Sequence, residues 1–201
     1  MVEQEILYND FDYKDYLFLT LQARNDCVSN LPKANNSMFY PSASVAFLPT
    51  SMDADFKSEN LSYLKLRAGY GTSAGFPTGY PTVNTVGQAT NQNGGAAGGI
   101  ITNAVSNFQA NPDLKPELLG EFELGFDATV WKGRVGINAS YFERTSKDLI
   151  VFKPLPISTG YTSTQDNIGK IEGKGIEVDL DLDMFEILPL NVDGLTWNAR
   201  V

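Results

Sequence analysis

Residues 175–183 read Gly-Ile-Glu-Val-Asp-Leu-Asp-Leu-Asp, a run in which apolar and acidic side chains alternate. Successive side chains of a strand lie on opposite faces, so this run predicts a strand with one apolar face and one acidic face. A charge that faces lipid costs up to about 2–4 kcal/mol near the bilayer midplane. The acidic face must therefore meet water, either in the lumen of a barrel or on the outside of a soluble sheet.

The same alternation recurs along the chain and predicts an all-β protein. The clear segments are 16–26, 39–47, 63–70, 120–130, 134–144 and 175–183, and weaker ones cover 3–12 and begin near Thr196. Together they predict an antiparallel up-and-down meander of about eight strands. Several approach the roughly 9–11 residues that a tilted strand needs to cross a bilayer. Residues 53–60 are expected to form only a helical turn within a connection.

The polar faces of these strands carry charges of both signs. If the sheet is part of a larger transmembrane barrel, these side chains are expected to face the lumen. They are Arg24, Lys65, Arg67, Glu121, Glu123, Asp127, Glu177, Asp179, Asp181 and Asp183. Charges of opposite sign on neighbouring strands can pair, so we expect partial neutralisation across the sheet.

The connections between the predicted strands alternate in length. Segments 27–38, 71–119 and 150–174 are long, whereas 13–15 and 131–133 are tight turns. Outer-membrane barrels have short turns at one rim and long loops at the other. Segment 48–62 weakens the pattern, because it is no shorter than 27–38.

The stretch 68–112 contains no Asp, Glu, Lys or Arg and is rich in Gly, Asn, Gln and Thr. Such a loop, with aromatic and amide side chains, suits a neutral polar ligand such as a sugar; Gly-rich composition alone is equally typical of a flexible surface loop. The candidate ligand residues are Phe76, Tyr80, Asn91, Asn93 and Phe108.

Composition excludes several functions. There is no histidine, and Cys27 is the single cysteine, so His-dependent triads and Cys-rich zinc sites are excluded. The net charge of −9 argues against nucleic acid as a partner. Glu121 and Glu123 share a strand face, but no convergent acid, base and nucleophile accompany them. We therefore expect no catalytic residue, no metal site, no cofactor and no enzymatic activity.

Several motifs together resemble one family. Segments 111–117 (NPDLKPE), 121–127 (EFELGFD), 154–161 (PLPISTGY) and 167–177 (NIGKIEGKGIE) are similar to elements of SusC/RagA-type TonB-dependent outer-membrane transporters, and 13–17, 39–46 and 64–71 match further blocks in the same order. Pro112 and Pro116 favour an extended chain. Gly169, Gly173 and Gly175 suit a bend or bulge. These motifs are interpreted as elements of construction, not ligand contacts.

The resemblance implies a plugged outer-membrane barrel, and such transporters can have about 22 strands. It would import oligosaccharide or peptide, with a SusD-type surface lipoprotein as partner and the TonB complex as energy source. No plug domain, TonB-contact segment or export signal is visible, and the C-terminus stops as a strand begins. Residues 1–201 are therefore expected to be a partial barrel domain, surrounded by the remainder of the barrel, the plug and outer-membrane lipid.

On its own, such a segment is expected to be unable to transport and to aggregate or need detergent, since an open sheet leaves unpaired edges. The alternative, from another class, is a soluble secreted β-sandwich that binds glycan. The two differ in what covers the apolar faces, which is lipid in the barrel and a second sheet in the sandwich.

Overall fold

The computed structural model describes residues 2–91, 100–183 and 198–200. Most of the chain forms one nine-stranded sheet, whose main path runs β1-β2-β3-β4-β8-β9-β10-β11. The strands of this path are β1 (Val2–Tyr13), β2 (Leu17–Val28), β3 (Ser37–Phe47), β4 (Leu61–Gly75), β8 (Glu117–Val130), β9 (Val135–Pro154), β10 (Ser163–Asp183) and β11 (Asn198–Arg200). Each pairs antiparallel with its neighbour on the path. The predicted up-and-down meander is confirmed.

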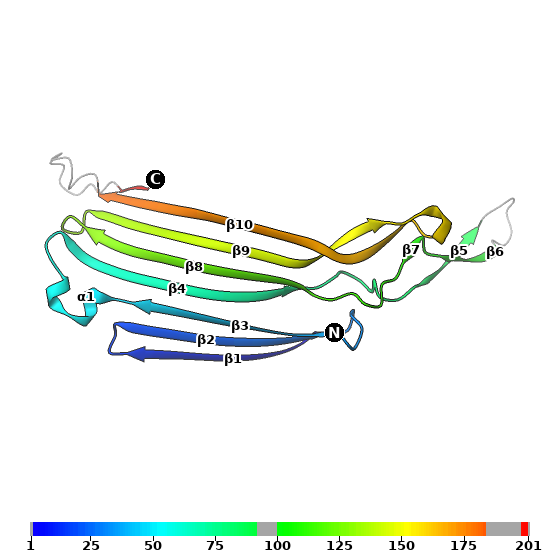
Figure 1. The fold of residues 1–201 in the computed structure, drawn as a ribbon, viewed down its shortest axis with the longest axis horizontal. Helices are drawn as coiled ribbons and strands as arrows, with labels where there is room; N and C mark the ends of the chain where they lie inside the picture. The colour runs from blue at the N-terminus through cyan, green and yellow to red at the C-terminus, as the bar shows by residue number, and fades with distance from the viewer. Residues whose placement is uncertain (1, 92–99, 184–197, 201) are drawn as a thin grey trace.

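The meander is a single curved layer, as Figure 1 shows. The other described sheet contains only β5 (Val86–Asn91) and β6 (Ile100–Val105). That small sheet lies beyond the end of the long strands and does not stack on them (Figure 1). Among the described residues no second layer covers the apolar face of the meander, so the β-sandwich alternative is wrong.

Strand lengths differ from the sequence prediction at the long-loop end. β9 and β10 contain 20 and 21 residues, so most of the segment 150–174 is strand and not loop. The link 71–119 likewise holds the end of β4, the β5–β6 hairpin and β7 (Phe108–Gln109), which pairs parallel with β10. Alternation of apolar residues marks only the part of a strand with a buried or lipid-facing side. The backbone hydrogen bonds between strands continue beyond that part, so the strands are longer than the alternation predicts.

The short turns gather at the opposite end of the sheet. In the β1–β2 turn, Lys14 and Asp15 have φ of 53° and 57°. Such left-handed backbone matches the twist of a hairpin. The helical turn expected within 53–60 is present as η1 (Ala54–Phe56), and a second short helical piece, α1 (Pro49–Met52), precedes it. Figure 1 shows α1 at the same end as the β8–β9 turn, so one rim carries compact connections.

The predicted glycine bulge is confirmed at Gly169 only. The β9–β10 register shifts on both sides of Gly169, whereas Gly173 and Gly175 lie in unbroken pairing. A Cβ on Gly169 would lie 2.7 Å from the Cβ of Leu149, closer than real side-chain carbons approach. Glycine therefore allows the two strands to keep pairing through the irregularity.

A small core sits at the long-loop end of the sheet. It consists of Val28, Leu31 and Leu114, with Phe76 and Ile150 packed against it. Leu114, from the NPDLKPE segment, has 0% of its surface exposed. This core joins β2, the end of β4, the entry to β8 and the outer part of β9.

Asn167 links the two most distinctive motifs of the sequence. Its Nδ2 donates to the Lys115 carbonyl at 2.9 Å, and its Oδ1 accepts from the Lys115 backbone N–H at 2.8 Å. The same Nδ2 also donates to the Asp148 carbonyl at 2.7 Å. Asn167 belongs to the NIGKIEGKGIE segment and Lys115 to NPDLKPE, so these contacts support the interpretation of both as elements of construction.

The two faces of the meander differ in chemistry. On one face the register aligns large apolar side chains, and those of β1, β2, β3, β4, β8 and β10 are exposed. They include Leu7, Phe11, Leu17, Leu19, Leu21, Phe39, Val45, Leu66, Phe122, Leu124, Phe126, Ile176, Val178 and Leu180. We call this set the apolar face. A water-soluble protein would not leave an apolar area of this extent exposed to solvent.

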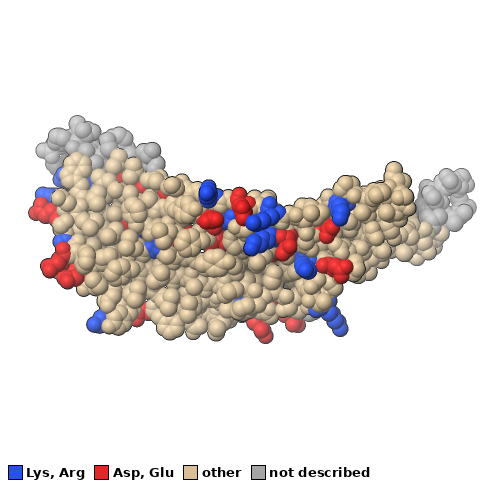
Figure 2. Space-filling model, in the orientation of Figure 1, with Lys and Arg blue, Asp and Glu red and all other residues tan. Residues whose placement is uncertain are grey.

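The apolar face ends part-way along β9 and β10. The next positions on the same face pair Glu143 with Lys174, Thr145 with Glu172 and Lys147 with Lys170. Figure 2 shows one side of the sheet, on which a broad area nearly free of charged residues separates the charged short-turn rim from a group of charges farther along the strands. The apolar face is therefore a bounded band, as expected where a sheet crosses a membrane.

Candidate functional site

The opposite side of the meander, which we call the polar face, carries the charged residues singled out in the sequence. Register places Lys65 opposite Asp127, Gly69 opposite Glu123 and Gly71 opposite Glu121. The polar face includes Arg24, Lys65, Arg67, Glu121, Glu123, Asp127, Glu177, Asp179 and Asp181. Asp183 lies in β10, but its side chain is outside the described residues.

Arg67 forms the centre of a network on the polar face. Its Nη1 lies 3.0 Å from Asp127 Oδ1, and its Nε lies 3.4 Å from Glu123 Oε1. Its Nη2 donates to Asn138 Oδ1 at 3.3 Å, and the Asn138 amide in turn donates to Asp127. The network joins β4, β8 and β9. A Cβ on Gly125 would lie 2.7 Å from Arg67 Nε, so glycine there leaves room for the guanidinium.

Other charges of the polar face are paired closer to the long-loop end. Arg144 binds Glu121 with Nη2–Oε2 and Nε–Oε2 distances of 2.6 and 2.7 Å. Arg24 binds Asp26 through two hydrogen bonds of 2.7 and 2.9 Å, and the Tyr40 hydroxyl donates to the same carboxylate. The Arg24 guanidinium also lies over the Tyr40 ring, 5.6 Å from its centroid.

The acidic positions of β10 have a different environment. Glu177 lies opposite Ser140 and Asp179 opposite Asn138 on β9, so their cross-strand neighbours are uncharged. Neutralisation across neighbouring strands therefore occurs at Glu121, Glu123 and Asp127 but not through β9 at Glu177 and Asp179. At Glu177 and Asp179 the polar face therefore keeps an acidic character toward β9.

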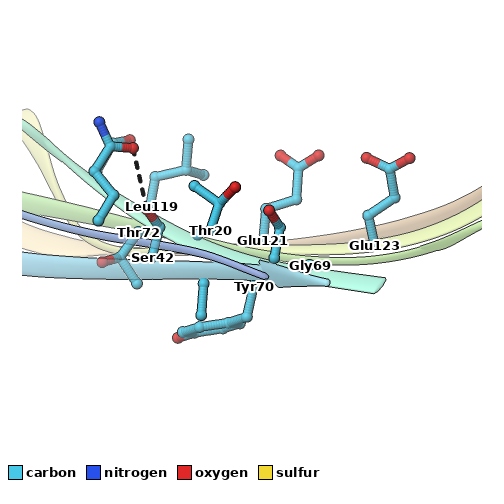
Figure 3. A pocket seen from close by; sticks show the side chains of 13 residues that line it. Thr20, Ser42, Gly69, Tyr70, Thr72, Leu119, Glu121 and Glu123 are labelled. Carbon is cyan, nitrogen blue, oxygen red and sulfur yellow. Dashed lines mark hydrogen bonds between the residues drawn. The ribbon is translucent and has the colours of Figure 1, made fainter. Parts of the chain in front are cut away.

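A groove of about 390 Å³ runs along the polar face between β2 and β8. Small residues of β3 and β4, among them Ser42, Ser44, Gly69 and Gly71, form its floor. Thr20 and Gln22 border one side and Glu121 and Glu123 the other. Figure 3 shows both carboxylates on the same side of the sheet as Thr20, whereas Tyr70 points away through the opposite side. The groove is preformed, and two carboxylates lie along one of its sides.

Replacing Arg67 with methionine should destabilise the sheet, because Asp127 and Glu123 would lose their guanidinium partner while Asn138 would lose a donor. We expect the free energy of unfolding to fall by about 1.5–3 kcal/mol, the usual worth of hydrogen bonds to charged groups. Equilibrium unfolding of the detergent-solubilised protein measures it. The double variant Arg67→Met with Asp127→Asn should recover part of the loss. A single variant as stable as the parent would contradict the network.

The candidate ligand residues of 68–112 do not form one cluster. Phe76 packs against the small core of Val28, Leu31 and Leu114. Tyr80 and Phe108 line a common pocket. Asn91 ends β5, but its side chain is outside the described residues, as is the whole of Asn93. The pocket also recruits Phe152 and Gln165, which sequence reasoning missed. The apolar cluster 149–152 was a signal for Phe152; nothing in the sequence singled out Gln165.

The described residues show little that could perform catalysis. Within the described ranges no group of three or more His, Cys, Asp or Glu residues could hold a metal ion. Glu121 and Glu123, which share a face, are each held by an arginine. In the same part of the chain, no helix has the length and hydrophobicity to cross a membrane. The chemistry available on the polar face is ion pairing and hydrogen bonding with a hydrated or protein partner.

Comparison with known families gives a match over nearly the whole chain. Residues 7–201 match the family model described as "TonB dependent receptor-like, beta-barrel". TonB-dependent receptor P26 of Formosa agariphila is 30% identical over 192 residues, which is 96% of this chain and 19% of that protein. TonB-dependent receptor P3 of the same organism is 27% identical over 172 residues, covering 86% of this chain and 17% of that protein. The chain thus spans only a minor part of these relatives, which are described as receptors and not as enzymes.

Solved structures share the fold. The RagAB peptide importer in its closed-closed state superimposes with a TM-score of 0.79 at 22% identity, covering 90% of this chain and 20% of that chain. The siderophore receptor PirA of Pseudomonas aeruginosa gives a TM-score of 0.59 at 15% identity, covering 99% of this chain and 30% of that chain. At these identities the likeness concerns the fold alone.

Proposed function

Because this chain belongs to the TonB-dependent receptor-like β-barrel family, we propose that it forms part of the wall of an outer-membrane importer. The observation that carries this proposal is the single-layer meander with an exposed apolar face and an ion-paired polar face. In a closed barrel the apolar face would contact lipid and the polar face would line the lumen. The remainder of the barrel would pair with the free edges of the sheet, as lipid requires.

The cargo that we propose is an oligosaccharide or a peptide. The family resemblance of the motifs supports both, and one of the solved structures with this fold is named a peptide importer. The proposed partners are a plug inside the barrel, a SusD-type surface lipoprotein over its mouth and the TonB complex as energy source. In this arrangement residues 1–201 are a partial barrel domain. The groove on the polar face beside Glu121 and Glu123 would then lie where the wall meets the plug or passing cargo.

The test is uptake by cells that express the complete protein containing this chain. We expect the protein in the outer-membrane fraction, and we expect labelled oligosaccharides or peptides to accumulate in the periplasm. Deleting the host TonB complex should abolish accumulation without changing the amount of protein in the membrane. Recovery of the protein in the soluble fraction, or uptake that does not depend on the TonB complex, would contradict the proposal.

A further inference from the structure

A second pocket lies at the long-loop end, away from the groove between β2 and β8. Its volume is about 310 Å³, within the range of small-molecule sites. The link after β4, β7, the end of β9 and the start of β10 all contribute to it. Its lining consists of Thr78, Tyr80, Pro81, Val83, Thr85, Ser106, Phe108, Phe152 and Gln165. None of these side chains carries a charge.

Hydrogen bonds between distant segments hold the walls of this pocket in place. β7 pairs parallel with β10, which places Phe108 beside Ser163. Asn84 Oδ1 accepts from the Ala110 backbone N–H at 2.8 Å, and Asn111 Nδ2 donates to the Gln165 carbonyl at 2.9 Å. The pocket is therefore formed before any ligand arrives, which lowers the entropic cost of binding.

Aromatic rings dominate one side of the pocket and remain open to solvent. Phe108 and Phe152 meet edge to face, with centroids 6.4 Å apart and planes at 76°. Phe152 is 71% exposed and Tyr80 is 60% exposed. Together these rings give the pocket mouth an apolar surface that a ligand can cover. Their faces suit the C–H-bearing face of a pyranose ring, and the hydroxyls of the lining suit its edge.

Gln165 adds an unmet polar group. Its Oε1 is buried and accepts no hydrogen bond from any described residue. A buried acceptor without a donor costs about 1–3 kcal/mol. A small rotation of this side chain, which lines the pocket, would allow a ligand hydroxyl to supply the donor.

The surroundings select against charged ligands. Lys153 and Asp166, the charged neighbours of Phe152 and Gln165 in sequence, point by alternation to the other face and bind each other at 3.1 Å. A carboxylate, sulfate or ammonium in the pocket would lose hydration without gaining an ion pair. We therefore propose that Tyr80, Phe108, Phe152 and Gln165 form a binding site for a neutral saccharide unit. This inference rests on the proposed importer only for its setting at the outer mouth of the barrel.

The test uses the complete protein in detergent, screened on an array of neutral and anionic oligosaccharides. The neutral oligosaccharide that binds best is then titrated by calorimetry. Phe152→Ala should weaken its binding about tenfold or more, since a central aromatic contact carries much of such an interface. Phe152→Trp, which keeps an aromatic face, should retain most of the affinity, and Gln165→Leu should weaken it.

Ile157→Ala is the matched control, because Ile157 is 91% exposed in the neighbouring η2 (Ile157–Thr159) and does not line the pocket. It should bind like the parent. Equal affinity of Phe152→Ala and the parent, binding of anionic sugars only, or no binding to any sugar would overturn the assignment. Membrane recovery and TonB-dependent uptake are measured on the same variants. TonB-dependent uptake without binding of a neutral sugar at this pocket would therefore overturn this inference and leave the proposed function unaffected.

Discussion

Replacing Leu124 with arginine is expected to destabilise the membrane-embedded protein by about 2–4 kcal/mol, the cost of a guanidinium on the lipid face near the midplane. Leu124 lies within the apolar face between Phe122 and Phe126, and it is 53% exposed. In water, a change at such an exposed position would alter stability by less than about 0.5 kcal/mol. The size of the loss therefore reports whether this face meets hydrocarbon. The change in the free energy of unfolding is measured by urea titration of the complete protein, reversibly folded in lipid vesicles.

Ser44→Arg is the matched control for this experiment. Ser44 is also exposed and lies on a strand of the same sheet, but register places it opposite Gly69 on the polar face. There an arginine would meet water in the lumen and leave stability nearly unchanged. Equal and small effects of both substitutions would show that the apolar face does not contact lipid, and the barrel-wall assignment would fail.

The fold could be predicted from the sequence, because the need to keep charged side chains out of lipid produces the alternation along each strand. Along 175–183, every second side chain must avoid lipid, so the acidic residues mark one face without ambiguity. The tight turns at 13–15 and 131–133 then indicated two neighbouring pairs, β1 with β2 and β8 with β9. The rest of the order was an expectation, above all the pairing of β4 with β8 across the long link 71–119, and the structure confirms it.

The structure of the long-loop end was harder to predict from the sequence. There the backbone hydrogen-bonding pattern, and not the period of the hydrophobic residues, determines where the strands run. β9 and β10 continue through Lys153 and Thr164, where neither face is uniformly apolar. Phe76 was expected in a ligand site and packs against the small core of Val28, Leu31 and Leu114, since composition cannot say which aromatic of a loop finds apolar partners. Gln165 and Phe152 face each other across β10 and β9, and they meet Phe108 because β7 pairs parallel with β10. No local sequence signal predicts that parallel pairing.

Replacing Leu114 with alanine is expected to loosen the long-loop end without opening the wall. The side chain is completely buried, and deleting such a group from a core costs about 2–5 kcal/mol, depending on how far the cavity collapses. Its neighbours Val28 and Ile150 belong to different strands, and Phe76 follows the end of β4, so the loss falls on contacts that join these segments. Amide hydrogen exchange around 110–116 and 148–150 should accelerate by about 30-fold or more, since each 1.4 kcal/mol is a factor of ten.

The exchange of the wall should change far less, because β2, β4 and β8 keep their ladders and none of the ion pairs around Arg67 involves Leu114. Local opening free energies differ across one structure, so the two regions can be read separately by exchange mass spectrometry. Ile157→Ala removes a similar apolar volume from an exposed position and should leave both regions unchanged. If Leu114→Ala instead accelerated exchange uniformly along β4 and β8, the small core would be part of the folding unit of the wall. If exchange did not change anywhere, Leu114 would have no role in holding the loop end together.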